Sequence, residues 1–185
     1  MAWLTREQIQ ALGITCFGDD VLISDRASIH GGVNMRLGNH VRIDDFAILT
    51  AKEPVVIGSY CHISARVFLG GTYGIEIGDF VNISVGCSVF SACDDCSGSH
   101  LIGPTVPDRF RGVANGKVVF GDYSGVGANS VVFPGVHFPE GSGIGALTLA
   151  HKSLEPWTYY LGVPMRKLKR RSTRLKDFAA ELLAK

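Results

Sequence analysis

Large apolar residues recur along most of this chain at a step of six. An aliphatic or aromatic residue opens each group of six, a small or acidic residue follows it, and a small residue takes the fifth place. The step is six within each triplet of such residues and eight between the first four triplets, so equivalent positions recur every 20 residues. The full register is Phe17, Ile23, Ile29, Leu37, Ile43, Leu49, Ile57, Ile63, Leu69, Ile77, Ile83, Val89, Phe120, Val126, Val132, Phe138 and Ile144.

This step predicts short strands instead of helices. Helical spacing fails throughout the region, whereas short strands separated by glycine, aspartate and asparagine turns fit it. Three strands and one corner with two extra residues make a coil of 20 residues. One large apolar side chain per strand then points inward and stacks on its counterpart in the next coil. We therefore expect an all-β solenoid over residues 17–150.

Two segments depart from the repeat. Between Val89 and Phe120 the step is 31 instead of six, so residues 91–117 must leave the coil as a long loop. Loops of this length on rigid scaffolds favour a functional role. After Ala150 the repeat ends, and residues 175–183 have the pattern of a short amphipathic helix. We divide the chain into an N-terminal cap (1–16), the solenoid (17–150) and a tail (151–185), which we expect to cap the solenoid.

The overall charge argues against a nucleic acid or a membrane surface as the main partner. The chain has 18 basic and 17 acidic residues, a net charge of +1. No apolar stretch reaches the roughly 18 to 20 residues of a membrane span, and the first residues lack the features of a signal peptide. The five cysteines are odd in number and unevenly spaced, which favours reduced thiols. We therefore expect a cytoplasmic protein.

The repeats resemble those of a known enzyme family. Segments 57–62 (IGSYCH), 77–82 (IGDFVN) and 126–131 (VGANSV) resemble the hexapeptide repeats of the left-handed β-helix acyltransferases. The resemblance covers about residues 17–150. It implies a left-handed parallel β-helix with a long loop and a short C-terminal α-helix. It also implies acetyl-CoA as co-substrate, a sugar acceptor, and a homotrimer with active sites between subunits.

The tail and the last coils carry the residues expected to bind coenzyme A. The run from Gly162 to Lys167 resembles the Gly-x-Pro-Ala-Lys segment that lies near coenzyme A in sugar acetyltransferases of this class, with Met165 in the place of alanine. Lys and Arg are natural partners of phosphates, so Lys152, Arg166 and Lys167 are our candidates. The basic run 169–171 is expected to be solvated. By the resemblance, Gly127, Ala128, Gly145 and Ala146 line the pantetheine arm, although such small residues also suit the turns of the coil itself.

The acceptor site is expected at the start of the loop. Many members of the family that acetylate a sugar hydroxyl carry a histidine there, where this chain has Ala92-Cys93-Asp94-Asp95. The stretch 94–98 resembles an Asp-Asp-aromatic-Ser-Gly stretch of transferases that acetylate nucleotide-linked 4-amino-4,6-dideoxy sugars for surface polysaccharide (O-antigen), with Cys96 in the aromatic place. A 4-amino sugar fits the missing histidine, because a free amine is a better nucleophile than an alcohol and needs less help from a protein base.

Four residues are our catalytic candidates: His62, Asp94, Asp95 and His100. Asp94 or Asp95 would hold the substrate ammonium and receive its proton through water, and His62 or His100 would complete the relay. His62 shares an outward-facing column with Arg42 and Asn82 of adjacent coils. In a trimer, the loop of a neighbouring subunit would bring Asp94 to this column.

Two other functions remain open from the sequence alone. One is a sugar O-acetyltransferase of the galactoside acetyltransferase type, in which His62 or His100 acts as the base. The other is a non-catalytic β-helix protein. The spacing of Cys93, Cys96 and His100 lacks a fourth ligand for a structural zinc, so no metal is expected. The exact sugar, its nucleotide and the acyl group are not fixed by the sequence.

Overall fold

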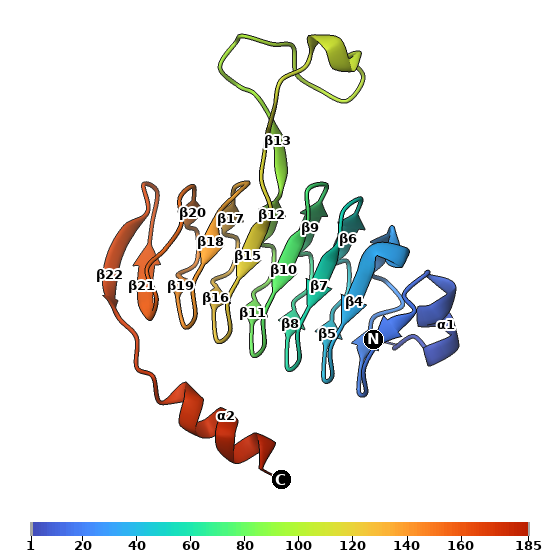
Figure 1. The fold of residues 1–185 in the computed structure, drawn as a ribbon, viewed down its shortest axis with the longest axis vertical. Coiled ribbons are helices and arrows are strands. Elements are labelled where there is room, and N and C mark those ends of the chain that lie inside the picture. Colours follow the sequence, from blue (N-terminus) through green and yellow to red (C-terminus); the bar gives the residue numbers. More distant parts are fainter. Residues whose placement is uncertain (1, 185) are drawn as a thin grey trace.

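The computed structural model describes residues 2–184 and shows a parallel β-solenoid with three sheets as its sides (Figure 1). The first sheet contains β1 (Cys16–Phe17), β4 (Met35–Leu37), β7 (Val55–Ile57), β10 (Ile75–Ile77), β15 (Val118–Phe120) and β18 (His137–Phe138). The second contains β2 (Leu22–Ile23), β5 (Arg42–Ile43), β8 (His62–Ile63), β11 (Asn82–Ile83), β16 (Gly125–Val126), β19 (Gly143–Ile144), β21 (Thr158–Leu161) and β22 (Arg166–Arg170). The third contains β3 (Ser28–His30), β6 (Ile48–Ala51), β9 (Phe68–Gly71), β12 (Ser88–Phe90), β17 (Val131–Val132) and β20 (Leu149–Ala150).

The strand register confirms the predicted repeat. Residues 20 apart pair as neighbours, as in Leu37 with Ile57 and Ile57 with Ile77. The register continues across the interruption, because Ile77 pairs with Phe120. The inward aliphatic residues of the second sheet, Ile43 and Ile63, have no exposed surface. The core is therefore a set of apolar stacks that run the length of the solenoid.

The corner between the first and second sheets carries a ladder of aromatic rings. His40, Tyr60, Phe80, Tyr123 and Trp157 stack in order, with ring centroids 4.5 to 6.1 Å apart. All five have φ between 51° and 61°, the left-handed region that bulky residues seldom adopt. The tight corner imposes this conformation, and stacking on the next ring stabilises it.

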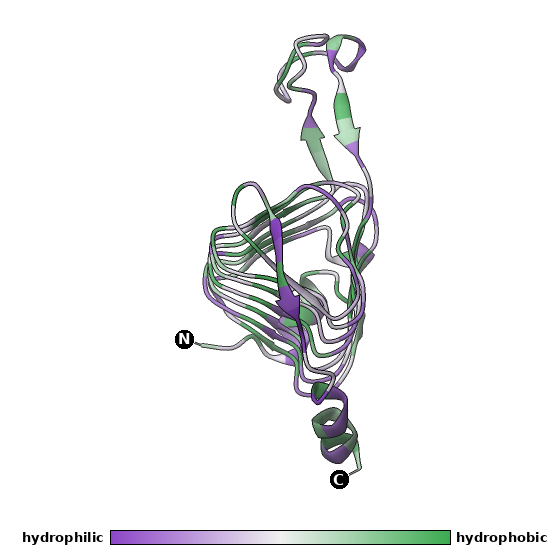
Figure 2. Ribbon diagram, turned by 90° about the vertical axis from the view of Figure 1, so that its left-hand side faces the viewer, coloured by the Kyte–Doolittle hydropathy of each residue, from purple (hydrophilic) through white to green (hydrophobic). Residues whose placement is uncertain are grey.

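The long loop leaves the solenoid at the corner opposite the second sheet. Its stem is an antiparallel hairpin of β13 (Ala92–Asp94) and β14 (Val113–Asn115), with a 3-10 turn, η2 (Asp108–Phe110), in its outer part. The hairpin follows β12 of the third sheet and precedes β15 of the first, and it projects away from the coils (Figures 1 and 2).

The ends of the solenoid are covered differently. At the N-terminal end, α1 (Arg6–Ala11) has a capping box between Thr5 and Gln8, and η1 (Gly32–Asn34) follows the first coil. At the other end, β22 pairs antiparallel with β21. The tail helix α2 (Leu175–Leu183) does not cover the end as expected; it lies beside the aromatic ladder, where it shares a cleft with Phe80 and Tyr123. Within residues 2–184, the helices are too short or too polar to cross a membrane.

Candidate active site

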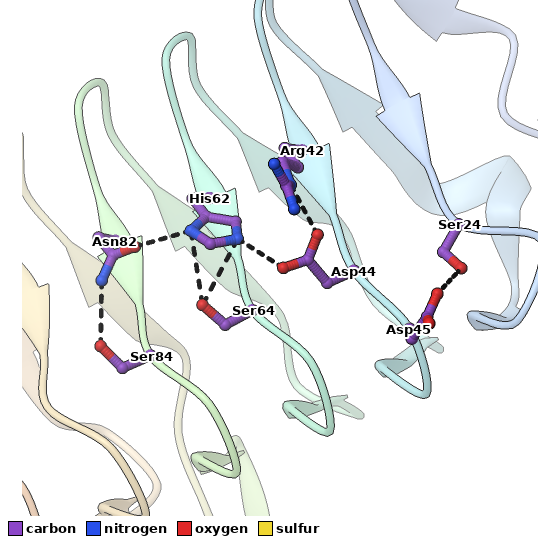
Figure 3. Close-up of polar contacts among 8 residues, drawn as sticks. All are labelled: Ser24, Arg42, Asp44, Asp45, His62, Ser64, Asn82 and Ser84. Carbon is purple, nitrogen blue, oxygen red and sulfur yellow. Dashed lines mark hydrogen bonds and ion pairs between the residues drawn. The ribbon is translucent and has the colours of Figure 1, made fainter. Parts of the chain in front are cut away.

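Polar side chains from three neighbouring strands form a continuous row on the outer face of the second sheet (Figure 3). We call Arg42, Asp44, His62, Asn82 and Ser84 the polar row. Arg42 Nε donates to Asp44 Oδ1 at 2.7 Å, and His62 Nε2 lies 2.8 Å from Asp44 Oδ2. His62 Nδ1 lies 3.0 Å from Asn82 Oδ1, and Asn82 Nδ2 donates to Ser84 Oγ at 3.1 Å. The predicted column of Arg42, His62 and Asn82 is confirmed by the strand register.

Asp44 is the buried member of the row and was missed by the sequence analysis. Only 7% of the Asp44 surface is exposed. Burial opposes ionisation of this carboxyl, but hydrogen bonds from Arg42 and His62 outweigh it and hold its pKa below the ordinary value. A signal for Asp44 exists in the repeat. The residue after the inward aliphatic is serine in the preceding coil and in the next two, and an aspartate here.

Ser84 lies in a shallow cleft that continues into a basic one. The Ser84 cleft, of about 190 Å³, is lined by Asn82, Ser84, Gly125, Val126, Gly127, Gly143, Ile144, Tyr159 and Arg171. The basic cleft, of about 470 Å³, is lined by Tyr159, Lys169, Arg170, Arg171, Ser172 and Leu175. Tyr159 and Arg171 belong to both clefts, so the two are contiguous.

The basic run 169–171 is therefore not simply solvated as expected. Arg171 is half-buried, and its Nη1 donates to the backbone oxygens of Tyr123, Gly141 and Ser142 at 2.7 to 3.0 Å. Burial lowers the pKa of Arg171. Lys169 and Arg170 are exposed at the rim of the basic cleft. Spacing alone did not separate these residues from an ordinary charged surface.

The four small residues predicted to line pantetheine lie together at the corner after the second sheet. Gly127 and Ala128 belong to one coil, and Gly145 and Ala146 to the next, because β16 pairs with β19. A Cβ on Gly127 would come within 2.3 Å of Ala146 N and 2.4 Å of Gly145 C. Close contact between coils thus already requires glycine at 127, and a role in pantetheine binding stays a prediction.

The three basic candidates are not gathered in one place. Arg166 and Lys167 begin β22, opposite Leu161 and Tyr160 of β21. Lys167 Nζ donates to Glu155 Oε2 at 2.5 Å, a hydrogen bond that lowers the pKa of Glu155. Lys152 is exposed in the corner after β20, at the far side of the third sheet from Gly127.

The two loop aspartates point to different surroundings. Asp94 Oδ1 accepts from Arg111 Nη2 at 3.0 Å, and Asp94 Oδ2 accepts from the backbone N–H of Gly103 at 2.9 Å. The Arg111 hydrogen bond is the main reason that the pKa of Asp94 is lowered. Asp94 lines the loop cleft, of about 500 Å³, which is formed by Lys52, Thr72, Tyr73, Ala92, Cys93, Asp94, Asp108, Arg111 and Val113.

Asp95 instead holds the loop to itself. Its carboxylate lies 2.9 Å from His100 Nδ1 and accepts from both the backbone N–H and the hydroxyl of Ser97. These contacts, the one with His100 first, lower the pKa of Asp95 to about 2. Asp95 and His100 therefore form a local pair outside the loop cleft.

The candidates fall into two groups that one chain keeps apart. His62 and Ser84 lie on the second sheet, whereas the loop with Asp94 leaves from the corner opposite that sheet. A single copy of this chain does not bring Asp94 to His62.

Comparison with known proteins gives the family. No family model matches the chain. A dTDP-4-amino-4,6-dideoxy-D-glucose acyltransferase of Escherichia coli is 35% identical over 178 residues, which cover 96% of this chain and 93% of the relative. The chain belongs to the hexapeptide-repeat acyltransferases. The non-catalytic alternative is thereby set aside, because this acyltransferase resembles an enzyme along nearly its whole length.

Solved structures of this acyltransferase family lead to the same conclusion. AntD, an N-acyltransferase from Bacillus cereus, was solved as an S84C variant with dTDP-4-amino-4,6-dideoxyglucose and coenzyme A. It is 42% identical, with a TM-score of 0.94 and coverage of 98% of this chain and 97% of AntD. AntD was also solved with dTDP and 3-hydroxybutyryl-CoA. A maltose O-acetyltransferase from Clostridium difficile 630 shares the fold alone, at 18% identity and a TM-score of 0.56, covering 90% of this chain and 74% of that one.

AntD was also solved as variants at its residues 84 and 94. They include substitutions such as S84A and D94N, and this acyltransferase has serine and aspartate at the same two numbers. Ser84 directly follows β11 of the second sheet, and Asp94 lines the loop cleft. Sequence reasoning had singled out Asp94 but not Ser84.

Proposed function

We propose that this acyltransferase moves an acyl group from a CoA thioester to the amino group of dTDP-4-amino-4,6-dideoxyglucose. The observation that carries this proposal is the near-complete mutual coverage with AntD, which was solved with this sugar and with coenzyme A. Acetyl-CoA is the expected donor, and 3-hydroxybutyryl-CoA is the alternative that AntD suggests. The product would serve surface polysaccharide biosynthesis in the cytoplasm, as expected from the sequence.

The chemistry is a direct transfer. The free amine attacks the thioester carbonyl carbon, a C–N bond forms, and the C–S bond breaks as CoA leaves as its thiol. No covalent enzyme intermediate is required. The carboxylate of Asp94, kept ionised by Arg111, holds the ammonium and receives its proton through water. The Ser84 hydroxyl faces the thioester carbonyl and donates a hydrogen bond to the oxygen on which negative charge develops.

The contiguous clefts suit an extended CoA. The thin pantetheine arm would follow the Ser84 cleft, where Gly125, Gly127 and Gly143 present no side chain. The phosphates would lie at the basic cleft, near Lys169 and Arg170. Arg166 lies at the other end of β22 and lines neither cleft, and Lys167 is already paired with Glu155, so the proposal rests on Lys169 and Arg170.

A homotrimer would bring the two groups together. Ser84 and Ser91, where the loop begins, belong to the same coil. Rotation about an axis parallel to the solenoid keeps every coil at its own height, so a neighbour's loop arrives level with Ser84. The third sheet and its corner expose apolar side chains, with Phe46, Ile48 and Leu147 exposed by 56%, 42% and 69%, which favours burial against a second copy.

The test is a thiol-release assay with two donors and a panel of acceptors. Acetyl-CoA and 3-hydroxybutyryl-CoA would each be combined with dTDP-4-amino-4,6-dideoxyglucose, with its GDP-linked counterpart, and with ordinary galactosides and glucosides. Turnover confined to the dTDP-linked amino sugar is expected. Turnover only on hydroxyl sugars would establish O-transfer instead. Silence across the panel, with no CoA binding by calorimetry, would remove the proposed donor site as well.

A further inference from the structure

The hydrogen bonds of the polar row fix the hydrogen positions on His62. Asp44 is ionised, and a carboxylate only accepts, so His62 Nε2 carries a hydrogen toward it. Asn82 uses its Nδ2 to donate to Ser84 Oγ, which leaves its Oδ1 facing His62 Nδ1 at 3.0 Å. An amide oxygen also only accepts, so Nδ1 carries a hydrogen as well. In this arrangement both ring nitrogens of His62 donate, Nε2 to Asp44 and Nδ1 to Asn82.

The same arrangement fixes the hydroxyl of Ser84. Its oxygen receives the hydrogen of Asn82 Nδ2, so its own hydrogen is not used in the row. That hydrogen is free to point into the Ser84 cleft, beside Gly127. If His62 were neutral, its Nδ1 would become an acceptor and the Asn82 amide would turn over. Asn82 Oδ1 would then take the Ser84 hydrogen, and the hydroxyl would present only lone pairs to the cleft.

We propose that Asp44, His62 and Asn82 are positioning residues that keep the Ser84 hydroxyl hydrogen aimed at the acyl donor. The Nδ1 hydrogen of His62 holds the amide oxygen of Asn82, so that the Asn82 Nδ2 faces Ser84. This inference rests on the proposed function, because it assigns a use to the Ser84 hydroxyl in that reaction. It gives His62 a role that differs from the proton relay expected from the sequence.

Asp44 holds the other side of the His62 ring. It directly follows β5, its Oδ2 lies 2.8 Å from His62 Nε2, and Arg42 is turned to its other oxygen. The Ser64 hydroxyl lies 3.4 Å from Nδ1 and 3.5 Å from Nε2, farther than Asn82 and Asp44. The two shorter contacts therefore set the orientation of the ring.

The first experiment replaces the amide of Asn82 by an isosteric carboxylate that cannot donate. N82D should draw the Ser84 hydrogen back into the row and lower kcat by roughly 10- to 100-fold, while KM for the acyl-CoA changes little. In an S84A background the same substitution should cost nothing further, because Asn82 acts only through Ser84. N39D is the matched control. Asn39 accepts from the backbone N–H of Asp19, in the corner on the other side of the second sheet from Ser84. The kcat of N39D should equal that of the parent.

Additive losses in the S84A and N82D pair would overturn the proposal. So would an S84A variant with the parent's kcat. Turnover of the amino sugar by the parent enzyme tests the proposed function independently. A failure of the positioning role of Asn82 is therefore distinguishable from a failure of that function.

A second experiment separates positioning from base catalysis with a double variant. In an S84A background, H62N should cost nothing further in kcat, because His62 acts only through Ser84. A His62 that acts as a base would lower kcat in that background as well. Circular dichroism and the oligomer mass of each variant confirm that it is folded. A further loss of kcat on adding H62N to S84A contradicts the inference.

Discussion

At the level of single residues, two adjacent aspartates with the same chemistry have different surroundings. Asp94 ends β13, and neighbouring residues of an extended chain point to opposite sides. Asp94 therefore faces the loop cleft and Arg111, while Asp95 turns to Ser97 and His100. The sequence could name the pair, but it could not tell them apart, because the difference depends on how the loop folds back.

Substitution should separate the two aspartates. D94N should lower kcat by about 100-fold, because the ammonium loses its carboxylate partner and proton acceptor. CoA binding, measured by calorimetry, should be unchanged. D95N should instead increase hydrogen exchange in residues 95–100 with a smaller effect on kcat. D25N, at an exposed position far from both clefts, serves as the charge control. Equal losses in D94N and D95N would contradict this division.

The Asp95 pair also makes a prediction about pH. The pKa of Asp95 is lowered from 3.8 to about 2, so the folded loop favours its ionised form. Its contribution to loop order should be complete above about pH 4 and should be lost as pH falls through about 2. Carbon-detected NMR of the Asp95 carboxyl should give a midpoint near 2 in the parent and a higher one in H100A. A midpoint near 4 in the parent would rule out the pairing.

The polar row shows a further limit of sequence reasoning at this scale. The column of Arg42, His62 and Asn82 followed from the 20-residue step alone. Asp44 and Ser84 also share one column, two coil periods apart, but a small or acidic residue at that position is typical of any corner of the repeat. Only the side-chain distances distinguish Asp44 as the partner of His62.

At the level of strands and corners, the contact between coils decides which glycines are indispensable. A Cβ on Gly127 would collide with backbone atoms of the next coil, whereas the closest atom to a Cβ on Gly125 is Asn82 O at 4.0 Å. Neither glycine has a positive φ. The two positions therefore differ in space and not in backbone conformation.

This contrast predicts a difference in stability between two otherwise matched variants. G127A should lower the free energy of unfolding by about 1 to 3 kcal/mol, because the backbone of residues 145–146 must move. G125A should leave that free energy nearly unchanged. Denaturant titration of the two variants beside the parent measures the difference. Equal stabilities would mean that the coils can separate at this corner without cost.

The positions of the elements that follow the repeat could be predicted from the sequence, whereas the positions of elements outside the repeat could not. The step of six gave one inward residue for each strand of the coils up to β19, and the start of the loop after Val89. It did not give Ala150 or the second buried residue of the first-sheet strands, such as Val55 and Ile75. The helix α2 was expected, but its position was not. Its contact with Phe80 and Tyr123 and the Lys176–Glu140 ion pair at 2.9 Å depend on how the chain turns after β22, which the repeat does not determine.

At the level of the whole molecule, the separation of Ser84 from Asp94 predicts complementation between subunits. S84A and D94A chains should each be nearly inactive alone. Co-folded in equal amounts, they should regain about a quarter of the parent activity, because one site in four joins an intact face to an intact loop. The oligomer mass of each sample, by light scattering, should be three times 19.9 kDa. A mixture no more active than its components would place each site within one chain.

The two ends of the solenoid also carry the molecule's two tryptophans. Trp3 bridges to Ser24 in the first coil and lies under the Arg42 guanidinium, 5.3 Å from the ring centroid. Trp157 closes the aromatic ladder in the last coil, beside Tyr123. Coils of a solenoid contact only their neighbours, so either end can open before the middle does. With W3F and W157F variants, tryptophan fluorescence would report separately on fraying at each end, and the order in which the coils come apart could be followed by optical means.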